Sequence, residues 1–526
     1  MSRLDIVPLP QFVSAESGEL VLTESTRIAS DGSATAASML LQEYLRKSTE
    51  FRFDLVPKAN KRYGDISLTI DPEMARRPEG YMLRVDAGGL LLSAGTLSGL
   101  RWGVQTIRQL LPVDLLRSAA TGLASCAIPC VTIDDSPRFP WRGVLLDVAR
   151  HFMPKEFVLK MVDLAALHRL NVFHFHLADD QGWRIKVPAW PKLVSVGAWR
   201  TRTAQGPVGQ PTGYCNVPHG GYYSEADLRE IVAYAARRSV TVMPEVGFPG
   251  HVQAAVSAYP ALGQCGEVQV RSEWGHSEHV LAPNELALRF VRDVLTTLVD
   301  VFPSEYIHIG GDECPRTEWR TSVDAQRRAR ELGLGSTDAL QSWFLRYGVD
   351  VLESLGRRAV GWDQVMEDGG VPQETLVMAW RDFAGDLAAQ ALTAGHDVVQ
   401  CPSSLTYLDH GQSELRAEPF SFYGITPFAD LINYDPSPPS LQIDGGAKVI
   451  GTQAHLWTEY MPTPRDVEYM AFPRLAAIAE AAWSSREVRI ARPLSLRLDA
   501  YLARLEALGV GYRPLSGPLP WQSQIV

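Results

Sequence analysis

The stretch of sequence that decides the fold is residues 142–178, RGVLLDVARHFMPKEFVLKMVDLAALHRLNVFHFHLA. Gly143–Ala149 and Val172–Ala178 are short apolar runs, which are typical of strands buried on both faces. Between them, Lys155–His168 repeats apolar residues at the 3.6-residue spacing of a helix. A buried strand, a helix and a second buried strand together make the unit from which parallel sheets are built. This stretch therefore predicts an α/β fold.

The same alternation of apolar runs and helical patterns continues toward the C-terminus. Further helical patterns occur at Glu225–Arg238, Glu285–Asp300 and Asp338–Leu355. Eight strand candidates with intervening helices predict a (β/α)8 TIM barrel with some long loops. A doubly wound open sheet is the alternative, but no Gly-x-Gly-x-x-Gly follows the first strand, which disfavours it. The six later strand candidates are Val240–Val246, Tyr306–Gly311, Arg358–Asp363, Leu376–Trp380, His396–Pro402 and Val449–Trp457.

Residues 1–137 predict a small α+β supporting domain that precedes the barrel, because short alternating runs and two amphipathic helical patterns follow one another there. Asp134-Asp135-Ser136-Pro137 is the expected joint, since Pro and Asp interrupt periodic structure. We expect the barrel to span residues 138–484. Residues 485–526 predict a C-terminal helical extension whose apolar stripe, which includes Leu498 and Leu505, packs on the barrel.

Composition excludes several classes of partner. The formal net charge is −10 and no basic run of five residues occurs, which argues against nucleic acid. No apolar stretch reaches about 18 residues, so no membrane span is expected. Asp5 interrupts the place of a signal sequence, which predicts a cytoplasmic protein unless a leader has been removed. No pattern predicts an oligomeric state.

The six cysteines are scattered and show no Cys-x-x-Cys spacing. They therefore predict no zinc site, and free buried thiols are the expected state, although disulfides stay open. We expect neither a metal nor a cofactor.

Acids and tryptophans recur where the predicted strands end. The catalytic groups of such barrels lie at the carboxyl ends of the strands. An acidic, aromatic mouth suits a sugar, because indole faces stack on pyranose C–H surfaces and carboxylates bind hydroxyls. The residues at these ends are, in chain order, Arg150, Asp179, Asp180, Glu245, His251, Asp312, Glu313, Trp362, Asp363, Trp380, Arg381, Tyr407, Asp409, Trp457 and Glu459.

Cleavage of a glycosidic bond needs a carboxylic acid that keeps its proton near neutral pH. Asp312 and Glu313 are adjacent carboxylates, and burial together with a neighbouring carboxylate raises such a pKa. Alternation along a strand would send the two side chains to opposite faces. They can serve one site only if the strand ends before them, which Gly310-Gly311 favours.

A resemblance to a known family makes the chemistry more specific. His308-Ile-Gly-Gly-Asp-Glu313 resembles the motif of glycoside hydrolase family 20, the β-N-acetylhexosaminidases. Residues 1–137 also resemble the small domain that precedes the barrel of this family. The similarity extends through Leu146-Asp-Val-Ala-Arg-His151, His176-Leu-Ala-Asp-Asp-Gln-Gly-Trp-Arg184, Pro244-Glu-Val-Gly-Phe-Pro-Gly-His251, Gly361-Trp-Asp363 and Gln453-Ala-His-Leu-Trp-Thr-Glu459.

The resemblance implies a retaining, substrate-assisted mechanism. The acetamide oxygen of the substrate attacks the anomeric carbon and forms an oxazolinium ion, so the protein supplies no nucleophile. By this resemblance Glu313 is the general acid and then the general base. Asp312 holds the acetamide N–H, and Tyr407 hydrogen-bonds the acetamide oxygen.

The resemblance also assigns the residues that surround the sugar. Asp179 and His251 would form a relay that tunes Glu313. Trp380, by contrast, is expected to pack in the barrel, and Trp343 can also be read as a core residue because it lies in a helical pattern. The sugar-binding residues that the resemblance implies are Trp343, Trp362 and Trp457 around the acetyl group and Arg150, Asp409 and Glu459 at the ring hydroxyls.

Two positions depart from the family pattern. The family often has an acidic residue at the position of Gly247, which leaves the shape of that loop open. Gln364 stands where the family has a glutamate, and we expect it to lie outside direct contact with the sugar.

The expected function is release of terminal non-reducing β-linked N-acetylglucosamine, or N-acetylgalactosamine, from oligosaccharides or glycoconjugates. A lacto-N-biosidase-type release of a disaccharide and a non-catalytic carbohydrate-binding protein are the alternatives. A metal-dependent amidohydrolase would explain His174-Phe-His176, but the fifth and sixth strand candidates lack the histidines that such a metal site needs.

Overall fold

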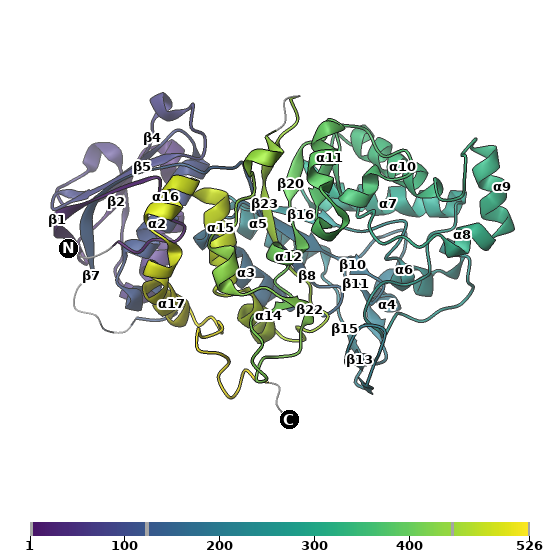
Figure 1. The fold of residues 1–526 in the computed structure, drawn as a ribbon. Helices are drawn as coiled ribbons and strands as arrows, with labels where there is room; N and C mark the ends of the chain where they lie inside the picture. The colour runs from purple at the N-terminus through teal and green to yellow at the C-terminus, as the bar shows by residue number, and fades with distance from the viewer. Residues whose placement is uncertain (1–3, 121, 123–125, 443–445, 524–526) are drawn as a thin grey trace.

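The computed structural model describes residues 4–120, 122, 126–442 and 446–523. An N-terminal domain built on one sheet lies beside a barrel, and the C-terminal helices α16 (Arg486–Ala491) and α17 (Leu498–Ala507) lie next to that domain (Figure 1). The N-terminal domain is therefore followed by the barrel in the chain and is also contacted by the C-terminal helices.

The barrel forms as predicted. In the described part of the chain its eight strands are parallel and close in the order β16-β17-β18-β19-β20-β23-β8-β9. Each predicted strand overlaps one of them, because strands buried on both faces carry continuous apolar runs. The strands are β8 (Trp141–Asp147), β9 (Val172–His176), β16 (Thr241–Glu245), β17 (Tyr306–His308), β18 (Arg358–Trp362), β19 (Leu376–Ala379), β20 (Val398–Gln400) and β23 (Val449–Leu456).

Helices surround the barrel, and the four that the sequence predicted are all present. The side chain of Ser224 caps the start of α5 by accepting a hydrogen bond from the Asp227 backbone N–H. The Asp227 carboxylate in turn accepts a hydrogen bond from the Ser224 backbone N–H. After β18 only a 3-10 helix, Asp363–Met366, follows. The long outer helices are α3 (Lys155–Leu167), α5 (Glu225–Ala236), α7 (Glu285–Val301), α10 (Leu340–Ser354) and α15 (Arg474–Trp483), and shorter ones are α8 (Thr317–Thr321), α9 (Val323–Glu331), α11 (Leu387–Thr393), α12 (Ser403–Thr406) and α14 (Pro464–Ala471).

The N-terminal domain is α+β, as expected. Its sheet has the strand order β1-β7-β5-β6-β4-β2-β3 and carries helices α1 (Thr35–Thr49) and α2 (Leu97–Leu110). The long strands β1 and β7 were not predicted, because β1 is mostly exposed and β7 contains Pro129 and two aspartates. The strands are β1 (Phe12–Leu22), β2 (Ile28–Ser30), β3 (Leu55–Pro57), β4 (Ile66–Ile70), β5 (Tyr81–Asp86), β6 (Gly89–Ala94) and β7 (Cys126–Asp135).

Asp135 joins the domain to the barrel from inside β7, whereas the sequence pattern placed it in an irregular joint. Its buried carboxylate accepts hydrogen bonds from Tyr81 Oη at 2.7 Å, Arg169 Nη1 at 3.1 Å and Trp483 Nε1 at 3.0 Å. Arg169 belongs to the barrel and Trp483 ends α15. An aspartate can therefore stay in the strand because its charge is fully paired.

The C-terminal helix α17 packs on both parts of the molecule. Tyr501 Oη lies 2.7 Å from Nε2 of His168, at the end of barrel helix α3. Arg504 donates to the backbone oxygens of Asp5 and Gln109, which belong to the N-terminal part. The expected contact with the barrel is thus accompanied by one with the N-terminal domain.

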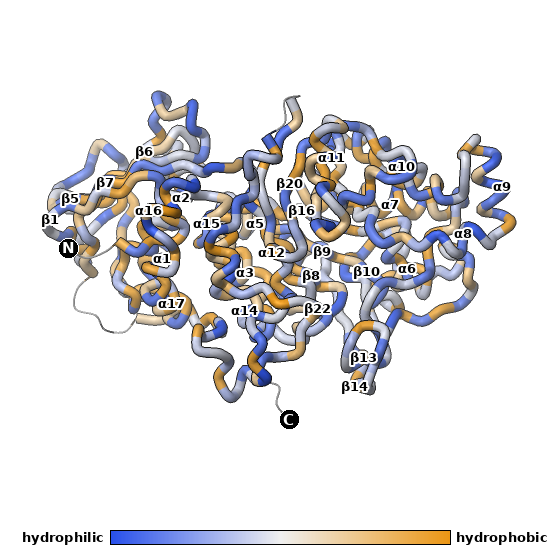
Figure 2. Tube along the Cα trace, viewed as in Figure 1, coloured by the Kyte–Doolittle hydropathy of each residue, from blue (hydrophilic) through white to orange (hydrophobic). Residues whose placement is uncertain are grey.

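Hydrophobic residues gather along the strands and inner helix faces, while hydrophilic residues follow the outer loops and helix α9 (Figure 2). No helix among the described residues combines the length and the apolarity needed to cross a membrane. All six cysteines are free, but Cys215 and Cys265 are exposed rather than buried as expected.

Candidate active site

The loop after β17 turns two carboxylates toward the same side. β17 ends at His308, and Gly310, Gly311 and Glu313 have positive φ of 70°, 92° and 43°. A Cβ atom at Gly310 would lie 2.6 Å from the Cα of Gly247, so the turn requires glycine there. The strand therefore ends before Asp312 and Glu313, as their joint use requires.

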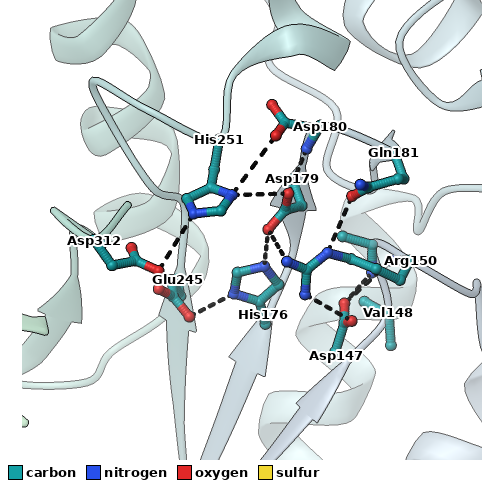
Figure 3. A network of polar contacts seen from close by, with 12 residues as sticks. Asp147, Val148, Arg150, His176, Asp179, Asp180, Gln181, Glu245, His251 and Asp312 are labelled. Atoms are coloured by element: carbon teal, nitrogen blue, oxygen red, sulfur yellow. Dashed lines mark hydrogen bonds and ion pairs between the residues drawn. The ribbon is translucent and has the colours of Figure 1, made fainter. Parts of the chain in front are cut away.

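His251 contacts both carboxylates with one nitrogen. Its Nε2 lies 3.4 Å from Asp312 Oδ2 and 3.5 Å from Glu313 Oε2. Its Nδ1 lies 3.1 Å from Asp179 Oδ1, and Figure 3 shows the ring between Asp179 and Asp312. Burial opposes a charge on His251, but the charges of Asp179 and Asp312 raise its pKa well above the ordinary value. The structure thus brings together the predicted acid pair and the two predicted supporting residues.

Arg150, after β8, is buried within the same network. Its guanidinium lies 2.9 Å from Asp179 Oδ2, 3.2 Å from Asp147 Oδ2 and 3.6 Å from Glu459 Oε1. It also lies over the ring of Trp457, with Cζ 5.2 Å from the ring centroid. Arg150 therefore makes structural ion pairs and also reaches the predicted sugar-binding residue Glu459.

Glu313 has a second histidine neighbour that sequence reasoning missed. His276 Nδ1 lies 3.5 Å from Glu313 Oε2. Burial raises the pKa of the Glu313 carboxyl, but the hydrogen bond from His276 and the positive charges of His251, His276 and Arg150 outweigh it, so the pKa lies below its ordinary value. This direction is contrary to the raised pKa that the sequence suggested, and it favours an ionised Glu313 near neutral pH. His276 lies in a loop between α6 (Gln253–Ala258) and α7, where no strand-end rule could find it.

Four aromatic rings form an aromatic wall, defined here as Trp362, Trp380, Tyr407 and Trp457. The Trp362 and Trp457 ring centroids are 5.9 Å apart, and those of Tyr407 and Trp457 are 6.1 Å apart. Trp380 stacks on Tyr407 with centroids 5.9 Å apart and an interplanar angle of 15°. Trp380 also packs against the buried barrel cluster that includes Trp362 and Met378, as expected, and it extends this wall.

Trp343 does not belong to the aromatic wall. It lies in the first turn of α10, where its ring packs edge-on against Phe344 at 4.8 Å. The guanidinium of Arg328, from the outer helix α9, lies over the same ring at 5.4 Å. The first turn of α10 also contacts the loop of the acid pair, because Gln341 Nε2 donates to the Gly311 backbone oxygen at 2.6 Å. The placement of Trp343 around the acetyl group therefore stays a prediction.

A buried arginine anchors the loop that carries Tyr407 and Asp409. Arg474 of α15 donates to the backbone oxygens of Leu408 at 2.6 Å and His410 at 2.9 Å. Burial, the Cys401 thiol and the carboxylates of Asp409 and Asp312 raise the pKa of Tyr407 well above its ordinary value. Tyr407 therefore keeps its proton and can donate a hydrogen bond.

Three buried polar atoms of the predicted sugar-binding residues make no hydrogen bond with the described residues. They are Asp409 Oδ1, Trp457 Nε1 and Glu459 Oε2. Burial and the neighbouring charge of Glu459 raise the pKa of Asp409 well above its ordinary value. Buried polar groups in native proteins nearly always have partners. These atoms are therefore suited to bind the hydroxyl groups of a ligand.

Comparison with known proteins agrees with this geometry. The model of the glycosyl hydrolase family 20 catalytic domain matches residues 139–486, and that of family 20 domain 2 matches residues 3–136. The chain belongs to glycosyl hydrolase family 20. It is thus a member of a family of glycoside hydrolases.

Individual members of family 20 resemble the chain over most of its length. A beta-hexosaminidase of Porphyromonas gingivalis is 36% identical over 99% of this chain and 65% of its own length, so the chain spans just under two thirds of that relative. A beta-hexosaminidase of Vibrio furnissii is 34% identical over 91% of this chain and 76% of its own. The crystal structure of an exo beta-N-acetylglucosaminidase from Vibrio harveyi with N-acetylglucosamine has a TM-score of 0.85 at 30% identity, covering 97% of this chain and 78% of that one.

The two departures from the family 20 pattern have simple structural readings. A Cβ atom at Gly247 would make only ordinary contacts, the nearest being His251 Cβ at 3.8 Å, so the loop has room for a side chain there. Gln364 accepts a hydrogen bond from Trp380 Nε1 at 3.3 Å and thus lies behind the aromatic wall.

Proposed function

We propose that this chain is an exo-β-N-acetylhexosaminidase that releases terminal non-reducing β-linked N-acetylglucosamine, and N-acetylgalactosamine, from oligosaccharides and glycoconjugates. The reaction retains the anomeric configuration and uses the substrate's acetamide oxygen as the nucleophile. The observation that carries the proposal is the pair Asp312 and Glu313, which share one histidine. The charge of Asp312 also raises the pKa of Tyr407, a member of the aromatic wall.

The spacing of the pair is too short for the acid and base of an inverting enzyme. The nearest ligand atoms of Asp312, Glu313 and His251 all lie within 4.8 Å of one another. An inverting pair needs roughly 6.5–9.5 Å between its carboxyl groups to admit a water molecule. With so short a spacing both carboxylates can reach one sugar. Glu313 protonates the leaving oxygen, while Asp312 accepts the N–H of the acetamide that attacks the opposite face of the anomeric carbon.

The aromatic wall supplies the acetamide pocket in this proposal. Trp343, Trp362 and Trp457 are all retained from the sequence hypothesis, and Trp380 supports Tyr407 by stacking on its ring. The protonated hydroxyl of Tyr407 donates to the acetamide oxygen and holds it toward the anomeric carbon. Arg150, Asp409 and Glu459 bind the ring hydroxyls, which would satisfy the unpaired oxygens of the two acids.

The proposed function is tested with a panel of substrates and the purified chain. Hydrolysis of an aryl N-acetyl-β-glucosaminide and of chitobiose, with N-acetylglucosamine as the product, is the expected result. Release of an intact disaccharide from a lacto-N-biose glycoside, without cleavage of the monosaccharide substrates, would favour the disaccharide-releasing alternative. Failure to cleave any aryl N-acetylhexosaminide between pH 4 and 8 (roughly the range in which a carboxyl acid works) would favour a carbohydrate-binding protein.

Removal of the His276 ring tests whether His276 lowers the pKa of Glu313. His276 lowers the pKa of Glu313, so the variant His276→Ala raises that pKa toward its ordinary value or above. The general acid must be protonated, so kcat/KM is high below the pKa of Glu313 and is lost as the pH rises through it. We therefore expect the alkaline limb of the kcat/KM profile to move to higher pH in His276→Ala.

The matched control for that profile is His279→Ala, because His279 contacts Glu318 and not Glu313. Its alkaline limb should coincide with that of the unmodified protein. A limb that stays in place or moves to lower pH in His276→Ala would show that His276 does not set the charge of Glu313.

A further inference from the structure

A single buried carboxylate, Glu245 at the end of β16, lies close to four side-chain nitrogens inside the barrel. Nδ1 of His176 lies 2.5 Å from Oε2, and Nε2 of His174 lies 3.0 Å from the same oxygen. Nδ1 of His308 lies 3.0 Å from Oε1, and Trp362 Nε1 donates to that oxygen at 2.9 Å. The His174-x-His176 pair that suggested a metal-dependent enzyme is therefore directed at this carboxylate.

Glu245 is the inner end of a chain of alternating carboxylates and imidazoles, which we call the charge chain. It runs from Glu245 through His176, Asp179 and His251 to Asp312 (Figure 3). Beyond the Glu245 contact, His176 Nε2 lies 3.1 Å from Asp179 Oδ2 and His251 Nδ1 lies 3.1 Å from Asp179 Oδ1. The charge chain thus connects the barrel interior to a carboxylate at the mouth.

Both imidazoles of the charge chain lie between two carboxylates. Burial opposes a charge on His176, but Glu245 and Asp179 outweigh it and raise its pKa to about 10. Each ring nitrogen of His176 can then donate a charge-assisted hydrogen bond, which is stronger than a neutral one. His251 is held in the same way, so its Nε2–H stays directed at Asp312 and Glu313.

We propose that Glu245 and His176 are positioning residues for Asp312. This proposal rests on the proposed function, and it adds Glu245 and His176 to the relay of Asp179 and His251. Glu245 keeps His176 charged, His176 fixes Asp179 together with Arg150, and Asp179 fixes the His251 ring against Asp312. The orientation of the carboxylate that holds the acetamide thus depends on a charge buried within the barrel.

Glu245→Gln separates this charge from the shape of the residue. The carboxamide oxygen can still accept from Trp362 Nε1, so the aromatic wall keeps its support. The carboxamide N–H₂ can donate to a neutral His176, which then loses the proton that made it a double donor. Asp179 is left with a weaker partner on that side.

The test is a double-mutant cycle between Glu245→Gln and Asp312→Asn, measured as kcat/KM on an aryl N-acetyl-β-glucosaminide. We expect Glu245→Gln to lower kcat/KM about tenfold when Asp312 is present, a coupling of the size seen between residues in one network. In the Asp312→Asn background we expect a change of at most about twofold, because the effect is assigned to the contact between His251 and Asp312, and only the contact between His251 and Glu313 remains. A purely structural role would lower both by the same factor, and that result, or no effect at all, would overturn the proposal.

Glu480→Gln is the matched control. Glu480 is another buried carboxylate, paired with Arg497 at 2.5 Å, but it lies on α15 away from the charge chain. Thermal unfolding should show that Glu480→Gln is less stable than the unmodified protein. Its effect on kcat/KM should be the same factor in the Asp312 background and in the Asp312→Asn background.

Two further results keep the test decisive. If Glu245→Gln does not fold, His176→Gln takes its place in the cycle with the same expected coupling. Cleavage by the unmodified protein combined with an additive cycle refutes the positioning role and leaves the proposed function standing. Absence of cleavage by the unmodified protein refutes both.

Discussion

The variant Glu313→Gln should lower kcat on chitobiose by at least ~100-fold, the low end of what general acid catalysis contributes. Glutamine keeps the shape of the side chain at the positive φ of 43° but cannot donate a proton to the leaving sugar. Steady-state kinetics on chitobiose and on a dinitrophenyl glycoside measure the effect. Because an activated phenol leaves without protonation, kcat/KM for the dinitrophenyl glycoside should fall much less.

Glu318→Gln is the control for this experiment. Glu318 follows the same loop on α8, but its carboxylate binds His279 and the backbone N–H of Val280 rather than the acid pair. It should retain most of its turnover on both substrates. Turnover of chitobiose by Glu313→Gln close to that of the unmodified protein would show that Glu313 is not the acid.

Much of the fold could be predicted from the sequence, because the barrel strands are buried on both faces. Val172–Ala178 was predicted as a strand and contains β9, since no polar residue other than histidine interrupts it. The strands β1 and β7 escaped prediction for the opposite reason. Most residues of β1 are exposed, and the aspartates that end β7 are stable there only because Asp135 meets Arg169 and Trp483.

The candidate site was predictable where it follows strand ends. Asp312, Glu313, Trp362 and Trp457 lie together because the carboxyl ends of parallel strands meet at one face of a barrel. His276 was missed because it reaches Glu313 from a long loop that carries no periodic signal.

Other features depend on neighbours that only the folded chain supplies. The periodicity of α10 predicted a helix at Trp343 but not that Arg328 would cover its ring. Likewise the pKa of Glu313 depends on the charges of His251, His276 and Arg150, which outweigh the burial that the sequence emphasised. The sign of such a shift follows from contacts between distant residues.

The acetamide of the substrate is the nucleophile in this account, so its removal should have the largest effect. A well-oriented neighbouring group acts like a reactant at an effective concentration of about 10⁵–10⁸ M. In the proposed mechanism no side chain replaces it, because Glu313 is the acid and Asp312 holds the acetamide. A substrate with a hydroxyl group in place of the acetamide should therefore be almost inert.

The most direct measurement compares kcat/KM for 4-nitrophenyl N-acetyl-β-glucosaminide with kcat/KM for 4-nitrophenyl β-glucoside, using the same protein preparation. Both substrates share the leaving group and the ring, so the ratio reports the acetamide alone. We predict that kcat/KM for the glucoside is at least ~1,000-fold lower, which is less than the full rate advantage of a well-oriented neighbouring group. Equal hydrolysis of the two glycosides would contradict the substrate-assisted mechanism.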